Sequence, residues 1–142
     1  MTTNSASARY EGFGKNGKGA ISTRSGVLSD QPYGFGTRFE GQPGTNPEEL
    51  IAAAHAACFT MATSFALASA GHDGGTLETN CVVTLDKDGA GFKVTKSELS
   101  LSATIPGISQ EDFASIADDA KANCPISKLL NCEVTLEKSL AG

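Results

Sequence analysis

A long alanine-rich segment near the middle of the chain contains no charged residue: Leu50-Ile-Ala-Ala-Ala-His-Ala-Ala-Cys-Phe-Thr-Met-Ala-Thr-Ser-Phe65. Asn46 is suited to cap a helix that begins here, with Pro47 at its first position and Glu49 at its third. Gly71 is suited to end it. Such a helix has about 24 residues and is about 36 Å long. Because its many alanines let another backbone approach closely, we expect a central, largely covered helix.

The same segment raises a membrane-spanning alternative, since no Asp, Glu, Lys or Arg occurs until Asp73. Its alanines, His55 and several hydroxyl side chains make it too weakly apolar for a bilayer. A helix buried in a soluble core explains the same pattern, so we expect no membrane association. Residues 1–8 have neither the basic region nor the apolar core of a signal peptide. We therefore expect a cytoplasmic protein.

Length, charge and residue spacing narrow the class of protein. The 142 residues fit a single domain, 1–142, and a chain of this length buries roughly two-thirds of its unfolded surface. The net charge is -5 and no basic run occurs, which makes nucleic acid and anionic membranes poor partners. There is no Cys-x-x-Cys, and the two histidines are not spaced as in a zinc finger. We expect no metal and no cofactor.

The rest of the chain is typical of strands and one further long helix, and therefore of an α+β fold. Along the predicted strand at 92–105, the apolar residues change from even-numbered to odd-numbered positions. This change predicts a bulge between Val94 and Leu99. The predicted elements are short extended pieces at 6–30 with a hairpin at Asn16-Gly17, a glycine-rich loop or edge strand at 31–41, strands at 76–85 and 92–105, a helix capped by Ser109 and interrupted by Pro125, and a last strand at 131–140.

Two of the four cysteines are candidates for chemistry. Cys58 is either a small packed hydrophobe or a reactive thiol, and because it lies in mid-helix, a reactive Cys58 would need a nearby cation. Cys124 precedes Pro125. If the proline begins a new turn, Cys124 is its N-cap and its thiolate faces unpaired N–H groups; otherwise it is a packed cysteine at a helix end. Cys81 and Cys132 fall on apolar strand faces and are predicted to be packing residues.

Three polar residues have a structural and a functional interpretation each. Arg38 is either a surface arginine or the cation for a buried thiolate. Glu49 is either the third residue of a capping box or the carboxylate that holds an arginine by a two-point pair. His55 lies three residues before Cys58 on the same helix, so a Cys–His dyad for acyl transfer is conceivable. A core or surface histidine is the simpler interpretation.

Five stretches, taken together, are more specific than any single motif. They are Ser25-Gly-Val-Leu28, Gln31-Pro-Tyr-Gly-Phe-Gly-Thr-Arg-Phe-Glu-Gly41, Gly44-Thr-Asn-Pro-Glu-Glu-Leu50, His55-Ala-Ala-Cys-Phe59 and Cys124-Pro125. With them the chain resembles the OsmC/Ohr family of organic-hydroperoxide peroxidases, on its OsmC (osmotically inducible protein C) branch. The resemblance covers nearly the whole chain and is weakest at residues 12–19.

The resemblance implies a thiol peroxidase. Cys58 matches the family's peroxidatic cysteine and Cys124 its resolving cysteine, while Arg38 and Glu49 match its activating arginine and glutamate. Arg38, held by Glu49, is then expected to keep Cys58 ionised. The thiolate would reduce an organic hydroperoxide, become a sulfenic acid and condense with Cys124 to a disulfide. An external dithiol, by resemblance a lipoylated protein, would restore both thiols.

A pocket beside the reactive thiol is expected to select the substrate. Side chains such as Phe39, Phe59, Met61 and Phe65 would line it. An apolar pocket of this kind would favour alkyl or aryl hydroperoxides over hydrogen peroxide.

The resemblance also implies an architecture: two central helices flanked by antiparallel sheets, in an intertwined homodimer with both active sites at the interface. Such a dimer would explain how a long uncharged helix stays soluble. Two other functions remain open. One is a non-redox Cys–His enzyme built on Cys58 and His55, and the other is a non-catalytic dimeric module that binds an apolar ligand. The presence of Arg38 and Glu49 in a matching context argues against both.

Overall fold

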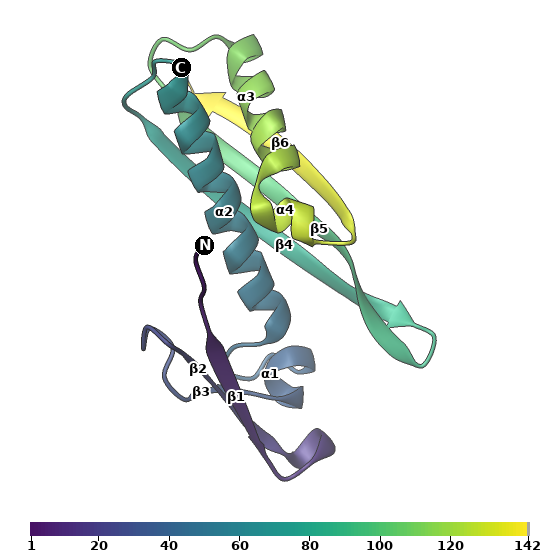
Figure 1. The fold of residues 1–142 in the computed structure, drawn as a ribbon. Coiled ribbons are helices and arrows are strands. Elements are labelled where there is room, and N and C mark those ends of the chain that lie inside the picture. The colour runs from purple at the N-terminus through teal and green to yellow at the C-terminus, as the bar shows by residue number, and fades with distance from the viewer. Residues whose placement is uncertain (142) are drawn as a thin grey trace. The chain divides into compact units, whose positions relative to one another are not determined.

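The computed structural model describes residues 1–141, which form two three-stranded sheets and four α-helices (Figure 1). The α+β class predicted from the sequence is confirmed. The residues cluster into two compact units, the first spanning Met1–Leu50 and the second beginning at Ile51. The long helix α2, Pro47–Ser69, begins in the first unit and continues through the second.

The first unit is an antiparallel sheet with the strand order β1-β2-β3. A 3-10 turn at Gly14–Asn16 joins the first two strands, which confirms the predicted hairpin. The segment 31–41 forms an edge strand and then a short helix that was not predicted. Five residues are too few to show helical periodicity. The elements are β1, Ala6–Glu11; β2, Lys18–Thr23; β3, Gln31–Tyr33; and α1, Phe35–Phe39.

The second unit contains a sheet with the order β4-β5-β6. Its strands are β4, Thr76–Asp88; β5, Gly91–Thr104; and β6, Glu133–Ala141. The first two form an antiparallel hairpin, whereas β6 runs parallel to β5. The prediction of purely antiparallel sheets is therefore wrong for this sheet. The chain leaves β5, crosses the sheet through helices and re-enters in the same direction, as parallel neighbours require.

The predicted bulge is confirmed in β5. Thr84 pairs with Lys96 and Leu85 pairs with Val94, so Thr95 is the extra residue. An extra residue reverses the face to which all following side chains point. This explains why the apolar phase of the sequence changes inside one continuous strand.

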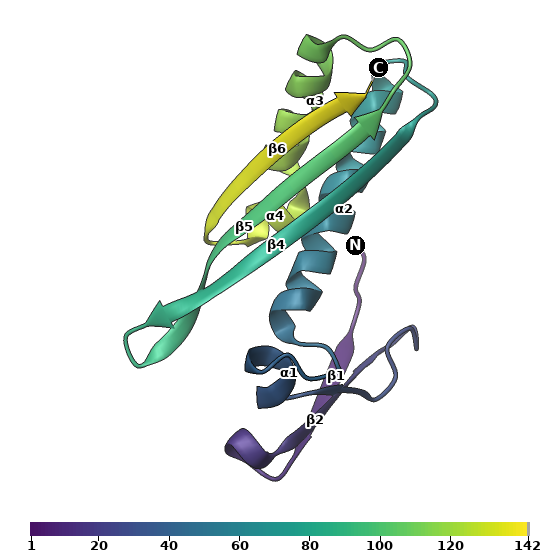
Figure 2. The same ribbon diagram turned by 180° about the vertical axis from the view of Figure 1, so that it is seen from behind.

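The helices lie on one face of this sheet, and the opposite face is uncovered (Figures 1 and 2). They are α2 together with α3, Gln110–Asn123, and α4, Pro125–Leu129. The predicted caps are confirmed: the Asn46 side chain accepts the Glu49 N–H at 2.8 Å, and Ser109 accepts the Asp112 N–H at 3.1 Å. These bonds satisfy backbone donors that have no partner inside their own helices.

The core lies between these helices and the sheet. Its buried side chains come from α2 (Phe59 and Leu67), β5 (Leu99 and Leu101) and α3 (Phe113 and Ala117).

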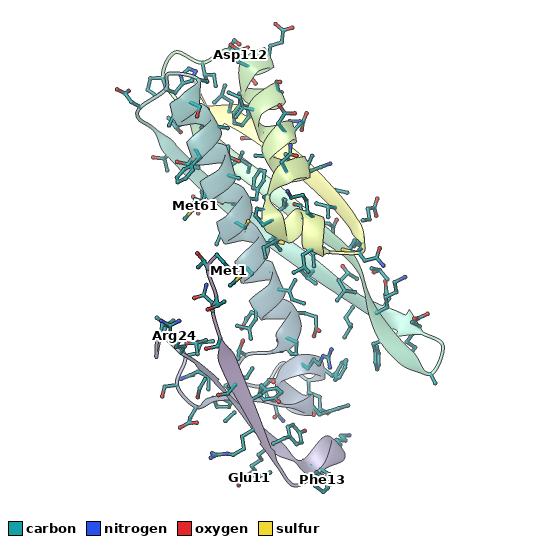
Figure 3. All side chains as sticks on the ribbon, in the orientation of Figure 1. Met1, Glu11, Phe13, Arg24, Met61 and Asp112 are labelled. Carbon is teal, nitrogen blue, oxygen red and sulfur yellow. The ribbon has the colours of Figure 1, made fainter. Side chains whose placement is uncertain are left out.

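The long helix α2 is covered on one face only. Its buried stripe recurs every fourth residue: His55, Phe59, Thr63 and Leu67. On another face Met61, labelled in Figure 3, is 62% exposed and Phe65 is 69% exposed. The prediction of a largely covered helix is thus wrong for the single chain. By length and composition α2 is also long and apolar enough to cross a membrane, the one such helix in residues 1–141.

Candidate functional site

The second unit contains an apolar pocket of about 630 Å³ between α2 and α4. Cys58 supplies the only thiol that lines it. Phe59 does not reach the pocket, since it has no exposed surface and belongs to the core; the prediction that it lines the pocket is wrong. The lining residues are Ala54, Ala57, Cys58, Met61, Ala62 and Phe65 of α2, with the first two residues of α4.

The structure places the thiols of Cys58 and Cys124 next to each other, and Cys58 packs against the core cluster that contains Cys124. Cys58 is half-buried, at the border between the buried stripe and the exposed apolar face of α2. Burial raises the pKa of the Cys58 thiol, the backbone N–H of Ile126 lowers it, and the neighbouring Cys124 raises it. The net effect is a raised pKa. The second unit on its own therefore holds Cys58 as a neutral thiol, because its contacts favour the thiolate less than water does.

Cys124 occupies the junction between α3 and α4 and has no exposed surface. It is the N-cap of α4, with Pro125 at the first helical position, as predicted for a proline that begins a new turn. Its Sγ accepts the backbone N–H of Ser127 at 3.3 Å, and its S–H donates to the Ser127 hydroxyl at 3.2 Å. These two contacts hold the Cys124 sulfur at the start of α4.

His55 is fully buried and both of its ring nitrogens contact hydroxyls. Nδ1 lies 2.6 Å from the Ser97 Oγ, and Nε2 lies 2.7 Å from the Ser127 Oγ. Burial lowers the pKa of His55, so the imidazole is neutral at pH 7. With both nitrogens engaged by serines, His55 is not placed as a base for Cys58, and the geometry does not support the Cys–His alternative.

Sequence reasoning missed both serines. Ser127 could have been found, because the side chains of an N-cap residue and of the third helical residue commonly contact each other. Ser97 gives no such signal, since its contact with His55 joins residues 42 positions apart.

Arg38 and Glu49, the other predicted site residues, belong to the first unit. Arg38 lies in the last turn of α1 and pairs with Glu48, with Nε–Oε1 and Nη2–Oε2 distances of 2.8 Å each. Glu49 instead accepts the Thr45 hydroxyl at 2.8 Å. The predicted pairing of Arg38 with Glu49 is therefore corrected to Glu48. Adjacent helical residues point about 100° apart, so only one of the two carboxylates faces the guanidinium.

The pair with Glu48 orients Arg38. The hydrogen bond from the guanidinium to Glu48 raises the pKa of Arg38 above its ordinary value, so its charge is permanent. The guanidinium also lies 5.4 Å from the ring centre of Phe39, within cation–π range.

The two remaining cysteines also lie in the second unit. Cys81 contacts the Ser97 hydroxyl at 3.2 Å, so this residue, predicted as a packing residue, also makes a polar contact. Burial raises the pKa of Cys81, and the nearby Cys132 raises it further. Within residues 1–141, no three His, Cys, Asp or Glu side chains gather as metal ligands would.

Known proteins share both the sequence and the fold. A family model described as OsmC-like protein matches residues 39–138. Peroxiredoxin OsmC of Escherichia coli is 53% identical over 133 residues, which cover 94% of this chain and 93% of that protein. Organic hydroperoxide resistance protein OhrB of Bacillus subtilis is 30% identical over 122 residues, covering 84% of this chain and 88% of that one. The solved structure of an organic hydroperoxide resistance protein from Elizabethkingia anophelis has a TM-score of 0.76 at 29% identity and covers 99% of this chain and 98% of its own. The chain therefore belongs to the family of OsmC-like proteins.

Proposed function

We propose that the protein is a thiol-dependent peroxidase that reduces organic hydroperoxides, with Cys58 as the peroxidatic and Cys124 as the resolving cysteine. The observation that carries this proposal is the proximity of the two thiols beside an apolar pocket that Cys58 lines. The names of its relatives, peroxiredoxin OsmC and organic hydroperoxide resistance protein OhrB, support the same reaction.

The reaction needs two steps at sulfur. The Cys58 thiolate attacks one peroxide oxygen, the O–O bond breaks, and the alcohol leaves after its oxygen takes a proton. Cys58 is now a sulfenic acid. The Cys124 sulfur then attacks it, so that the S–O bond breaks, an S–S bond forms and water is released. A dithiol, for which we propose a lipoylated protein, reduces the disulfide by two exchange steps.

The pocket favours bulky hydroperoxides. Apart from the Cys58 thiol, the side chains that line it are aliphatic, aromatic or thioether groups. Its volume of about 630 Å³ is in the range of small-molecule sites. An alkyl or aryl substituent gains about 25 cal/mol for each Å² of apolar surface that it buries there. Hydrogen peroxide has no such surface and gains nothing from the pocket.

Arg38 supplies the positive charge that Cys58 needs. Because burial raises the pKa of Cys58, a cation must offset this effect for the thiolate to form at neutral pH. Arg38 is permanently charged and is held by Glu48 in one orientation. Glu49, whose role rests on the resemblance, remains a site residue in this proposal through its bond to Thr45.

The active protein is an intertwined homodimer in the cytoplasm, and the whole chain forms one domain. The exposed apolar face of α2, with Met61 and Phe65, supports the dimer because a second copy would remove it from water. Cys58 borders this face, so a partner covering it would close the pocket. One domain is supported by α2, which continues without a break across the boundary between the two units.

The test uses a sulfenic-acid trap. Cys124→Ser protein is treated with one equivalent of cumene hydroperoxide and dimedone, and the adduct is mapped by mass spectrometry. The adduct is expected on Cys58. Cys132→Ser is the matched control and is expected to retain peroxidase turnover. An unmodified Cys58, or full turnover in Cys58→Ser, would refute the proposal.

A further inference from the structure

A chain of hydrogen bonds runs through the second unit from the resolving cysteine to the sheet. It starts at the Cys124 Sγ, which is 3.2 Å from the Ser127 Oγ, and continues over 2.7 Å to Nε2 of His55. From Nδ1 of His55 it passes over 2.6 Å to the Ser97 Oγ and over 3.2 Å to the Cys81 Sγ. Residues from α4, α2, β5 and β4 thus form one connected polar network inside an apolar core.

The donors and acceptors of this network are consistent with one direction. With the Cys124 S–H donating to Ser127, the Ser127 O–H is free to donate to Nε2 of His55. The neutral imidazole then carries its proton on Nδ1 and donates it to Ser97, whose own O–H points to Cys81. Each hydroxyl accepts one bond and donates one. This arrangement leaves Nε2 without a proton, as a base requires.

We propose that His55, acting through Ser127, receives the proton of Cys124 while Cys124 attacks the Cys58 sulfenic acid. His55 does not contact the reacting sulfurs and acts only through Ser127, so it is a positioning residue for the resolving step. This inference rests on the proposed peroxidase function. The S–S bond forms as the S–O bond breaks; Cys124 sulfur is oxidised and Cys58 sulfur is reduced. The departing hydroxide takes up the proton that left Cys124, so water is released and His55 returns to its neutral form.

The surroundings of Cys124 explain why such a relay is needed. Cys124 has no exposed surface, so bulk water cannot receive its proton directly. The groups that face His55 are the hydroxyls of Ser97 and Ser127 and the thiol of Cys81, at 4.0 Å from Nδ1. Burial lowers the pKa of His55, and none of these three contacting groups carries a permanent charge. The same burial disfavours the imidazolium relative to the neutral ring, which suits a relay that returns its proton.

The test separates the two steps in time. Reduced protein is mixed with one equivalent of cumene hydroperoxide, quenched at successive times and analysed by mass spectrometry for sulfenic acid and disulfide. Chemical quenching is needed because the chain has no Trp to report by fluorescence. In His55→Gln we expect sulfenic acid formation within about twofold of wild type and disulfide formation at least about tenfold slower, a change of about 1.4 kcal/mol in the barrier.

The pH dependence of disulfide formation distinguishes a proton relay through His55 from a purely structural role of this residue. In the wild type, disulfide formation should slow as the pH falls through the pKa of His55, which lies below its ordinary value of 6.5. In His55→Gln this step in the profile should be absent. Ser127→Ala should reproduce the slow resolution with the imidazole still present, and Ser127→Thr, which restores the hydroxyl, should recover most of the rate.

Thr63→Val is the matched control. Thr63 lies on the same buried stripe of α2, has no exposed surface, and bonds only within its own helix in the contacts of residues 1–141. Both steps should keep their wild-type rates in this variant. Resolution at the wild-type rate in Ser127→Ala, or a slow His55→Gln that keeps the wild-type pH profile, would overturn the relay alone. Absence of both the sulfenic acid and the Cys58–Cys124 disulfide in the wild type would overturn the proposed function and the relay with it.

Discussion

The guanidinium of Arg38 and the carboxylate of Glu48 form a two-point pair with both N–O distances at 2.8 Å. The Glu48 side chain is 13% exposed and that of Arg38 is 34% exposed, so the pair is partly shielded from water. Two parallel hydrogen bonds define both the position and the plane of the guanidinium. Arg38 is thereby held in a single orientation by the first turn of the helix that also carries Cys58.

Substitutions of Arg38, Glu48 and Glu49 should show which of the two glutamates supports Arg38. In Arg38→Ala we expect kcat/KM for cumene hydroperoxide to fall at least about tenfold, or about 1.4 kcal/mol, because the variant lacks the cation proposed to stabilise the Cys58 thiolate. Glu48→Gln should lower kcat/KM more than Glu49→Gln, since only Glu48 contacts Arg38. The pH dependence of Cys58 alkylation, resolved by mass spectrometry, should move to higher pH in Arg38→Ala. An unmoved profile would remove Arg38 from the site.

The stability of the fold should depend on the protonation of His55. The folded state holds its imidazole neutral with a lowered pKa, while the unfolded chain protonates near 6.5. The unfolded state therefore binds more protons between these two values, and the free energy of unfolding falls as the pH drops below about 6.5. Urea denaturation between about pH 5 and 8 should detect this decline in wild type and a smaller one in His55→Gln. His72→Gln, which lies outside the network, should keep the wild-type decline.

The two faces of α2 should respond differently to the loss of a phenylalanine. Phe59 has no exposed surface, so Phe59→Ala should lower the free energy of unfolding by about 3–5 kcal/mol at every protein concentration. Phe65, on the same helix, is 69% exposed in the single chain. Its replacement by alanine should cost less than about 0.5 kcal/mol in the monomer. Chemical denaturation of dilute samples measures both, and equal losses would contradict the assigned faces.

The proposed dimer should depend on the exposed apolar face of α2. Met61→Glu places a charge in a surface that a partner would bury, so it should shift the protein to the monomer in sedimentation experiments. The matched control is Val82→Glu, which adds the same charge at a similarly exposed residue of β4, 59% against 62%. Val82→Glu should leave the mass unchanged. A monomeric wild type, or a dimer that tolerates Met61→Glu, would contradict the arrangement.

Features that depend on neighbouring residues could be predicted from the sequence. Asn46 and Ser109 cap their helices because a side-chain oxygen reaches a backbone N–H three residues away. The bulge at Thr95 follows from the alternation of apolar residues along one strand. Cys124 caps α4 because the proline after it can begin a helix but cannot continue one.

Contacts between residues far apart in the sequence could not be predicted and are known only from the structure. The parallel pairing of β6 with β5 depends on the path of the chain through α3 and α4, which has no local sequence signal. The choice of Glu48 over Glu49 depends on which side of α2 faces α1, and both residues fit the same helical turn. Only folding brings Ser97 to His55, across 42 positions.

By itself, the sequence determined the α+β class, the family, the two cysteines and the ends of the long helix. These follow from local composition, capping and motifs, in which the interacting groups are only a few residues apart. Only the tertiary structure decided that the Cys58 and Cys124 thiols are neighbours and that Cys124 joins a buried histidine through Ser127. The physical reason is that hydrogen bonds and burial depend on distances in space, which are set when α2, α4 and the sheet pack around one core.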